Sequence, residues 1–214
     1  MHRTFLAWFP GIALSALGLC ALPAQASAEG SSLVPKSAEI AILRNPGTPP
    51  AGSKNADVIL VEYFDYNCPF CKKLAPALER LIKADSKVAL VYKDWPILSD
   101  VSAYAARRAL AADWQGKYAV AHDTLMRASH LASDSQVDTL LAGAGIDLKK
   151  LDADSHTHAA EIHKLLQRND TEARALGIRG TPGLLVGRHM VDGVYTVSGL
   201  QQAVALARAS ANSG

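Results

Sequence analysis

The chain has 214 residues, of which 22 are basic and 20 acidic, so its formal net charge is only +2. This balance gives no electrostatic argument for a nucleic acid or an anionic membrane surface as the partner. The length suits one globular domain, or one domain that carries a sizeable insertion.

The first 28 residues predict an exported precursor. Arg3 supplies a short basic region, Phe5–Leu22 is largely apolar, and Ala26-Ser27-Ala28 fits a small-x-small cleavage site. We expect cleavage after Ala28, with Ala26 as the second choice, and a periplasmic location. An uncleaved membrane anchor is the alternative, because an apolar core of 18 residues just spans a bilayer.

The cysteines are few and unevenly placed. Cys20 is lost with the signal peptide, which leaves Cys68 and Cys71. One close pair is not a structural disulfide framework, and a bridge that closes so short a loop constrains the unfolded chain little. A Cys₄ zinc site needs a second pair, which the sequence lacks.

Residues 29–56 are rich in Ser, Pro, Gly and Ala, with one short apolar stretch at Ile40–Leu43. We predict that they form an extended N-terminal arm. Apolar runs then predict a buried strand over 57–64, a helix over 69–84 and a strand over Val88–Tyr92. The core-facing positions of the helix are Leu74, Leu78, Leu81 and Ile82.

The pattern becomes helical between residues 99 and 176. The first predicted helix is Ala103–Ala112, capped by Asp100 or Ser102, and the second is Lys117–Ala128, after a break at Gly116. The third is capped by Asp134 or Ser135 and ends at 143–145. The fourth covers 148–176, with a break near Asp154-Ser155.

Strands return at Gly183–Val186 and Gly193–Val197, and Ser198 is expected to cap a last helix, Leu200–Ser210. Gly187 and Asp192-Gly193 supply the turn signals. This order of elements predicts an α/β domain, residues 57–98 and 177–211, that is interrupted by an all-helical insertion at 99–176.

The sequence Cys68-Pro69-Phe70-Cys71 lies at the predicted turn from strand to helix. The first N–H groups of a helix have no partner within it, and the helix dipole favours negative charge there, so the thiolate of the first cysteine is stabilised. Such a pair opens and closes as a disulfide. We therefore predict thiol–disulfide exchange.

Three segments together carry a family resemblance. Glu62–Cys71 looks like a strand and active-site turn, Lys72 and Pro76 lie where thioredoxin-like helices often carry lysine and a kinking proline, and Leu176–Gly183 looks like a cis-proline loop. Over about residues 54–210 the chain thus resembles the thioredoxin superfamily, and specifically its exported DsbA-like branch. The resemblance implies an α/β thioredoxin fold with an inserted all-helical subdomain.

The resemblance also implies roles for the catalytic side chains. Cys68 is expected to be the exposed nucleophile, and Cys71, deeper in the helix, to resolve the mixed disulfide. Glu62 lies where the family carries a buried acid; burial should raise its pKa and let it relay a proton to or from Cys71. The alternative is an acid at a sheet edge that faces solvent.

The substrate is expected to lie against Thr181, Pro182 and Phe70. Thr181-Pro182 should form a cis bond, and the Thr181 backbone should pair with an extended substrate segment. An ordinary turn proline is the alternative. Phe70 carries no positive charge, unlike the histidine of some strongly oxidising relatives, which indicates a less depressed Cys68 pKa and a less extreme oxidant. Thr181 is typical of relatives that shuffle or reduce disulfides and favours isomerase or reductase chemistry.

For other residues near the motif and after the second strand we expect structural roles. Asp65, Tyr66 and Asn67 are expected to shape the turn and the groove rim, Lys72 and Lys73 to be solvated helix positions, and Trp95-Pro96 to be core and turn.

Three histidines also lie close together in the sequence. His156, His158 and His163 with Glu161 offer imidazole ligands that suit copper. Their spacing does not place them on one helix face, so we expect solvated histidines and no metal site.

By this resemblance we expect a periplasmic oxidase that introduces disulfides into exported proteins. One alternative is an isomerase or reductase kept reduced by a membrane donor. Another is a Cu(I)-binding copper-tolerance protein, in which both thiols hold the metal. The expected partners are exported proteins and a membrane redox partner, either a quinone-linked oxidant or an electron donor. We expect a monomer, no cofactor and no nucleic acid.

Overall fold

The computed structural model describes residues 33–44, 47, 51–193 and 195–211. The predicted signal peptide, residues 1–28, and both candidate cleavage sites lie outside the described residues. Among the helices that the structure describes, none is both long enough and apolar enough to cross a bilayer.

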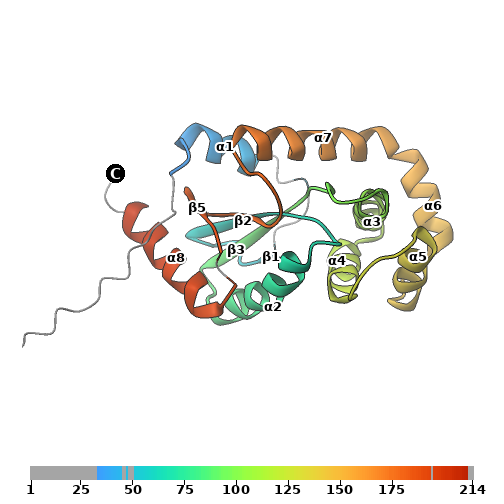
Figure 1. Ribbon diagram of the computed structural model, residues 1–214, viewed down its shortest axis with the longest axis horizontal. Helices are drawn as coiled ribbons and strands as arrows, with labels where there is room; N and C mark the ends of the chain where they lie inside the picture. Colours follow the sequence, from blue (N-terminus) through green and yellow to red (C-terminus); the bar gives the residue numbers. More distant parts are fainter. Residues whose placement is uncertain (1–32, 45–46, 48–50, 194, 212–214) are drawn as a thin grey trace, which may run out of the picture.

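In the described part of the chain, a five-stranded mixed sheet forms the centre (Figure 1). Its order is β1-β3-β2-β4-β5, and the strands are β1 (Ala51–Gly52), β2 (Val58–Phe64), β3 (Val88–Asp94), β4 (Gly183–Val186) and β5 (His189–Val191). The middle strand, β2, runs parallel to β3 and antiparallel to β4. β2 is buried throughout except at the half-buried Ile59, because a continuous apolar run suits a strand that is covered on both faces.

Helices cover both faces of the sheet (Figure 1). On one face, α2 (Pro69–Ala84) and α8 (Val197–Ala211) bury a core with the apolar side chains of β2, β3 and β4. On the other face, α1 (Lys36–Arg44) and the C-terminal half of α7 (Ala159–Ala175) pack on the sheet through Ile42 and Ala173. The last helix of the predicted insertion therefore also covers the sheet.

The remaining helices stand beside the sheet (Figure 1). They are α3 (Asp100–Ala111), the 3₁₀ turn η1 (Ala112–Gln115), α4 (Tyr118–Arg127), α5 (Asp134–Gly143) and α6 (Leu148–Thr157). Their shared core also contains Phe64, Cys68 and Cys71. The predicted α/β domain with an inserted helical block is thus the observed architecture, and the two parts share one core at the cysteines.

Two predicted segments are wrong. The extended arm forms a helix at Lys36–Arg44 and a short strand at Ala51–Gly52, because Ile42, only 3% exposed, completes the core on the sheet. The last strand is His189–Val191 rather than Gly193–Val197. Gly187, with φ +56°, turns the chain back at once, so only two residues separate β4 from the new strand.

Several helix ends are displaced by a few residues. Ser99 and Ser133, not the residues that follow them, cap α3 and α5, since their hydroxyls accept the N–H of Ser102 and Gln136. The fourth predicted helix breaks at His158 rather than near Asp154-Ser155.

Candidate active site

The two cysteines lie where β2 ends and α2 begins. Cys68 is the N-cap residue of α2, and its backbone N–H donates to the Asp65 carbonyl at 3.0 Å. The backbone N–H of Cys71, in the first turn, lies 3.5 Å from the Cys68 sulfur. Both residues are free thiols. The sulfur of Cys68 therefore occupies the place where a side chain satisfies the unpaired N–H groups of a helix.

Cys68 is less accessible than predicted. It is 3% exposed and Cys71 is 0% exposed, so Cys71 is the deeper of the two but neither is open to solvent. The prediction of an exposed Cys68 is wrong for this dithiol state. The reason is the loop that precedes β4: the Cys68 thiol donates to the Thr181 carbonyl at 3.1 Å, which brings this loop against the sulfur.

The surroundings of the two thiols drive their pKa values apart. A hydrogen bond from the Cys71 thiol, helped by the Thr181 hydroxyl and by backbone N–H groups and opposed by burial, lowers the pKa of Cys68 to about 6. Burial, the hydrogen bond to Cys68 and the nearby Glu62 raise the pKa of Cys71. At neutral pH, Cys68 is therefore mainly a thiolate and Cys71 a thiol.

Thr181 offers the Cys68 sulfur two different partners. Its carbonyl accepts the S–H of the thiol form. Its buried hydroxyl has no hydrogen-bond partner among the described protein groups and is free to donate to the thiolate form. The peptide bond from Thr181 to Pro182 is cis. Both protonation states of the sulfur therefore find a partner in this loop.

Glu62 lies on β2, six residues before Cys68. It is 1% exposed, and its Oε1 atom accepts no hydrogen bond from any described residue. Burial, with a smaller effect from Cys68, raises the pKa of this carboxyl group to about 8. A carboxylic acid that stays protonated near neutral pH thus lies close enough to the dithiol to act on the pKa of Cys71 and to respond to Cys68.

An aromatic pair, the exposed Phe70 and the half-buried Tyr195, forms the rim of the site. Phe70 is 54% exposed, and its ring centroid lies 6.0 Å from that of Tyr195. The Lys73 ammonium lies 5.3 Å from the centre of the Tyr195 ring. Tyr195 is not predicted from the sequence, because it is far along the chain from the cysteines and has no motif around it. Lys73 is exposed, as predicted.

Asp65 and Asn67 hold the turn that precedes Cys68. The buried Asp65 carboxylate accepts from Asn67 N–H at 2.7 Å, and from the N–H groups of Ile97 and Leu98 at 2.9 and 3.0 Å. The Asn67 side chain exchanges two hydrogen bonds with the backbone of Leu131. The turn is therefore fixed to both the sheet side and the helical side of the molecule.

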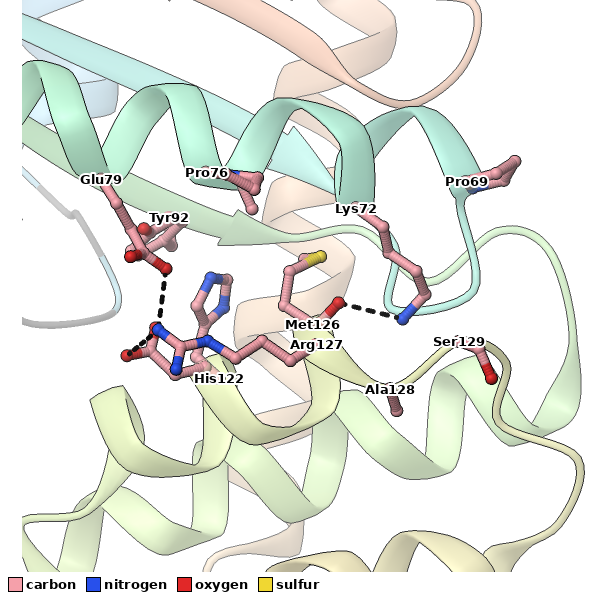
Figure 2. Close-up of a pocket in the computed structure, with 12 residues that line it drawn as sticks. Pro69, Lys72, Pro76, Glu79, Tyr92, His122, Met126, Arg127, Ala128 and Ser129 are labelled. Carbon is pink, nitrogen blue, oxygen red and sulfur yellow. Dashed lines mark hydrogen bonds and ion pairs between the residues drawn. The ribbon is translucent and has the colours of Figure 1, made fainter.

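Beside the motif, a cleft of about 570 Å³ lies between α2 and α4 (Figure 2). Pro69, Lys72 and Pro76 line it from α2, and Tyr92 and His122 lie deeper. The prediction that Lys72 is a solvated position is wrong. It is half-buried, and its ammonium donates to the carbonyls of Leu125 and Met126 at 3.0 and 3.4 Å.

The histidines of the insertion are dispersed. His156 and His163 are exposed, whereas His158 stacks on Trp114 at 3.8 Å between centroids and lies 3.5 Å from Glu161. Within the described residues, no group of three or more His, Cys, Asp or Glu side chains is arranged to hold a metal ion.

Trp95, which follows β3, is buried as predicted, and its indole N–H donates to Asp170 at 2.9 Å.

A reactive dithiol at a helix start, facing a cis-proline loop on a central mixed sheet, defines a thioredoxin-fold redox protein. A family model described as Thioredoxin matches residues 44–205. The chain belongs to this family, and it resembles the DsbA-like members of the superfamily.

Two solved structures show this similarity. A thioredoxin-like oxidoreductase from Silicibacter pomeroyi is 37% identical with a TM-score of 0.75, over 82% of this chain and 98% of that one. The thiol–disulfide exchange protein alpha-DsbA2 from Wolbachia pipientis is 26% identical with a TM-score of 0.70, over 78% of this chain and 94% of that one.

Among curated proteins, a similar one is Na(+)/H(+) antiporter NhaA 3 of Salinispora tropica. It is 31% identical over 163 residues, which are 75% of this chain but 24% of the antiporter. The chain thus spans about a quarter of the length of the curated relatives it matches.

Proposed function

We propose that the chain is a periplasmic protein thiol–disulfide oxidase that introduces disulfides into exported proteins through Cys68 and Cys71. The observation that carries this proposal is the position of the Cys68 sulfur at the N-cap of α2, against the Thr181 carbonyl, where its surroundings lower its pKa to about 6 and those of Cys71 raise the pKa of Cys71. A stabilised thiolate favours the reduced state of the pair, and this makes the oxidised pair a stronger oxidant.

In the proposed reaction, a substrate thiolate attacks the Cys68 sulfur of the oxidised pair. The Cys68–Cys71 bond breaks, a mixed disulfide forms, and Cys71 leaves as a thiolate. Glu62, whose pKa is about 8, is protonated at neutral pH and supplies the proton that Cys71 takes up. A second substrate thiolate then displaces Cys68, whose low pKa makes it a good leaving group.

Over the two steps the substrate gives up two electrons and two protons and gains a disulfide. One proton replaces the one that Glu62 gave to Cys71, and the other goes to solvent, because Cys68 leaves as a thiolate. The Cys68–Cys71 pair is reduced and must be reoxidised after each turnover. We therefore propose a quinone-linked membrane oxidant as the redox partner. In the opposite direction, Cys71 attacks the Cys68 sulfur of a mixed disulfide and releases a reduced substrate.

The substrate is proposed to bind across the Thr181–Pro182 loop. The Thr181 backbone lies beside the Cys68 sulfur and can pair with an extended substrate segment. The exposed Phe70 ring, beside the half-buried Tyr195, adds an apolar surface at the rim. Backbone pairing and apolar contacts do not depend on a particular substrate sequence, which suits an enzyme that acts on many unfolded proteins.

The reduction potential of the Cys68–Cys71 pair in a glutathione buffer tests the direction of the reaction. A value near about −120 mV supports the oxidase. A value at or below roughly −180 mV contradicts it and favours an isomerase or reductase, the direction that Thr181 indicates.

Trapping of partner proteins tests exchange itself. With Cys71→Ser, a substrate that reacts with Cys68 stays attached because no second thiol releases it. We expect reducible adducts with exported proteins, and none with Cys68→Ser as the matched control. A protein that only holds Cu(I) through both thiols traps none.

A further inference from the structure

The residues on either side of the Cys68–Cys71 motif both bind the same segment of the helical insertion. On the N-terminal side, Asn67 Nδ2 donates to the Leu131 carbonyl at 3.1 Å, and Asn67 Oδ1 accepts the Leu131 N–H at 2.8 Å. On the C-terminal side, Lys72 Nζ donates to the carbonyls of Leu125 and Met126. Residues 125–131 are therefore held at two points that bracket the dithiol.

The Lys72 contact satisfies groups that α4 leaves without partners. Leu125 and Met126 belong to the last turn of α4, where carbonyls have no N–H donor within the helix. The negative end of the helix dipole also lies there and attracts a cation. Figure 2 shows the Lys72 side chain reaching from α2 across the cleft to Met126. The Lys72 ammonium therefore binds the end of α4 instead of extending into solvent.

Burial shows that the lysine is held in place. Lys72 is half-buried, and burial lowers the pKa of its ammonium group to about 8, opposed by the nearby Asp65, Cys71 and Cys68. Thus the same charge that binds α4 also lies within electrostatic range of both thiols. The other charged groups of the cleft are Glu79 on α2 and Asp123 and Arg127 on α4, and Arg127 pairs with Glu79 at 3.1 Å.

The two parts of the molecule also share a core at this point. Cys68 and Cys71 pack in one apolar cluster with Leu125, Met126 and Leu131, all of them nearly inaccessible to solvent. A shift of residues 125–131 would therefore change both the packing around the sulfurs and the position of the Lys72 charge.

We propose that Asn67 and Lys72 are paired positioning residues, which fasten the 125–131 segment of the helical insertion to the redox motif and thereby set the reactivity of Cys68. The inference rests on the proposed function of this site. It assigns the insertion a part in the chemistry, in addition to its packing.

Lys72→Met is the main test, because it keeps the apolar stem and removes the donors. We expect amide hydrogen exchange in residues 118–131 of the reduced protein to become about five- to tenfold faster, since each lost hydrogen bond is worth about 1 kcal/mol. The pH midpoint of Cys68 alkylation should also rise, because the thiolate loses a nearby cation. Lys72→Arg should restore both values in large part.

Lys83→Met is the matched control. Lys83 is on the same helix, and its side chain is 78% exposed and distant from the motif, so neither readout should change. Asn67→Ala is the second test, with faster exchange at Leu131 N–H as its direct signature. If Asn67→Ala does not fold, the readouts of Lys72→Met still test the proposal. Amide exchange and alkylation in Lys72→Met that both match those in Lys83→Met would overturn the proposal.

These readouts separate the two proposals. Alkylation of Cys68 and amide exchange need no substrate protein and no redox partner. If Cys71→Ser traps no proteins but Lys72→Met alters both readouts, the proposed function fails and the positioning role stands. If trapping succeeds and Lys72→Met changes nothing, the reverse holds.

Discussion

The two faces of the central sheet differ in whether a buried ionisable side chain has a partner. On the face covered by α7, Lys93 is fully buried and its ammonium lies 3.0 Å from Glu172, which also accepts the Tyr63 hydroxyl at 3.2 Å. On the face covered by α2, Glu62 is equally buried, yet its Oε1 atom has no partner among the described residues.

This difference separates a structural charge from a reactive one. The Lys93 ammonium is paired with Glu172, whose charge and hydrogen bond oppose the burial that lowers the pKa of Lys93. Glu62 has no such pairing at its Oε1 atom, and burial, with a smaller effect from Cys68, raises its pKa to about 8, into the range where a proton is exchanged readily. The unpaired group is the one that lies beside the dithiol.

Glu172→Ala should have the largest effect on stability, because it leaves the Lys93 amine buried without its carboxylate. We expect the free energy of unfolding to fall by about 4 kcal/mol, measured by urea unfolding at pH 7. Glu161→Ala is the matched control on α7: its side chain is 72% exposed, and the change should cost less than about 0.5 kcal/mol. If both variants lose the same small amount of unfolding free energy, the buried pair contributes no more to stability than an exposed carboxylate.

Glu62→Gln should have the opposite effect and a distinct pH dependence. Because the pKa of Glu62 is raised from 4.5 to about 8, the folded protein binds a proton that the unfolded chain has lost. Stability should therefore fall as pH rises from about 4.5 to 8. Glutamine removes this loss, so we expect the variant to match the wild type at pH 4, to exceed it by about 2 kcal/mol near pH 6, and to exceed it by more at pH 9.

The measurement uses the oxidised protein, in which neither cysteine titrates. Parallel stability curves for wild type and Glu62→Gln from pH 4 to 9 would contradict a raised carboxyl pKa. The same variant should slow the reduction of the Cys68–Cys71 pair by a model dithiol at neutral pH by about tenfold or more, since it removes the proton donor. Unchanged rates would leave Glu62 without a relay role.

Local patterns predict the part of the site that is contiguous in sequence. The apolar run of β2, the helix start and the Cys68–Cys71 spacing specify the strand, the turn and the capping sulfur together, and the raised pKa of Glu62 follows from its place in that run. Residues whose roles depend on distant partners are missed. Lys72 has the sequence of a solvated helix position, and its carbonyl partners lie 53 and 54 residues away.

The errors in the fold have a similar origin. Lys36–Arg44 forms a helix because Ile42 has a sheet to pack on, a contact that composition does not reveal. The last strand begins at His189, a polar residue that is buried because its imidazole lies 3.0 Å from the Ser210 hydroxyl of α8. Hydropathy alone therefore misplaces it to 193–197.

Tyr63→Phe should give the smallest effect and sharpen the comparison between the faces. It removes only the hydroxyl that donates to Glu172 and keeps the ring that packs edge-on against Trp95 at 6.5 Å. Because Lys93 still pairs with Glu172, we expect a loss of about 1 kcal/mol in urea unfolding and no change in the pH midpoint of Cys68 alkylation. A shifted midpoint would mean that the two faces are electrostatically coupled through β2, and the division between a structural and a reactive charge would not hold.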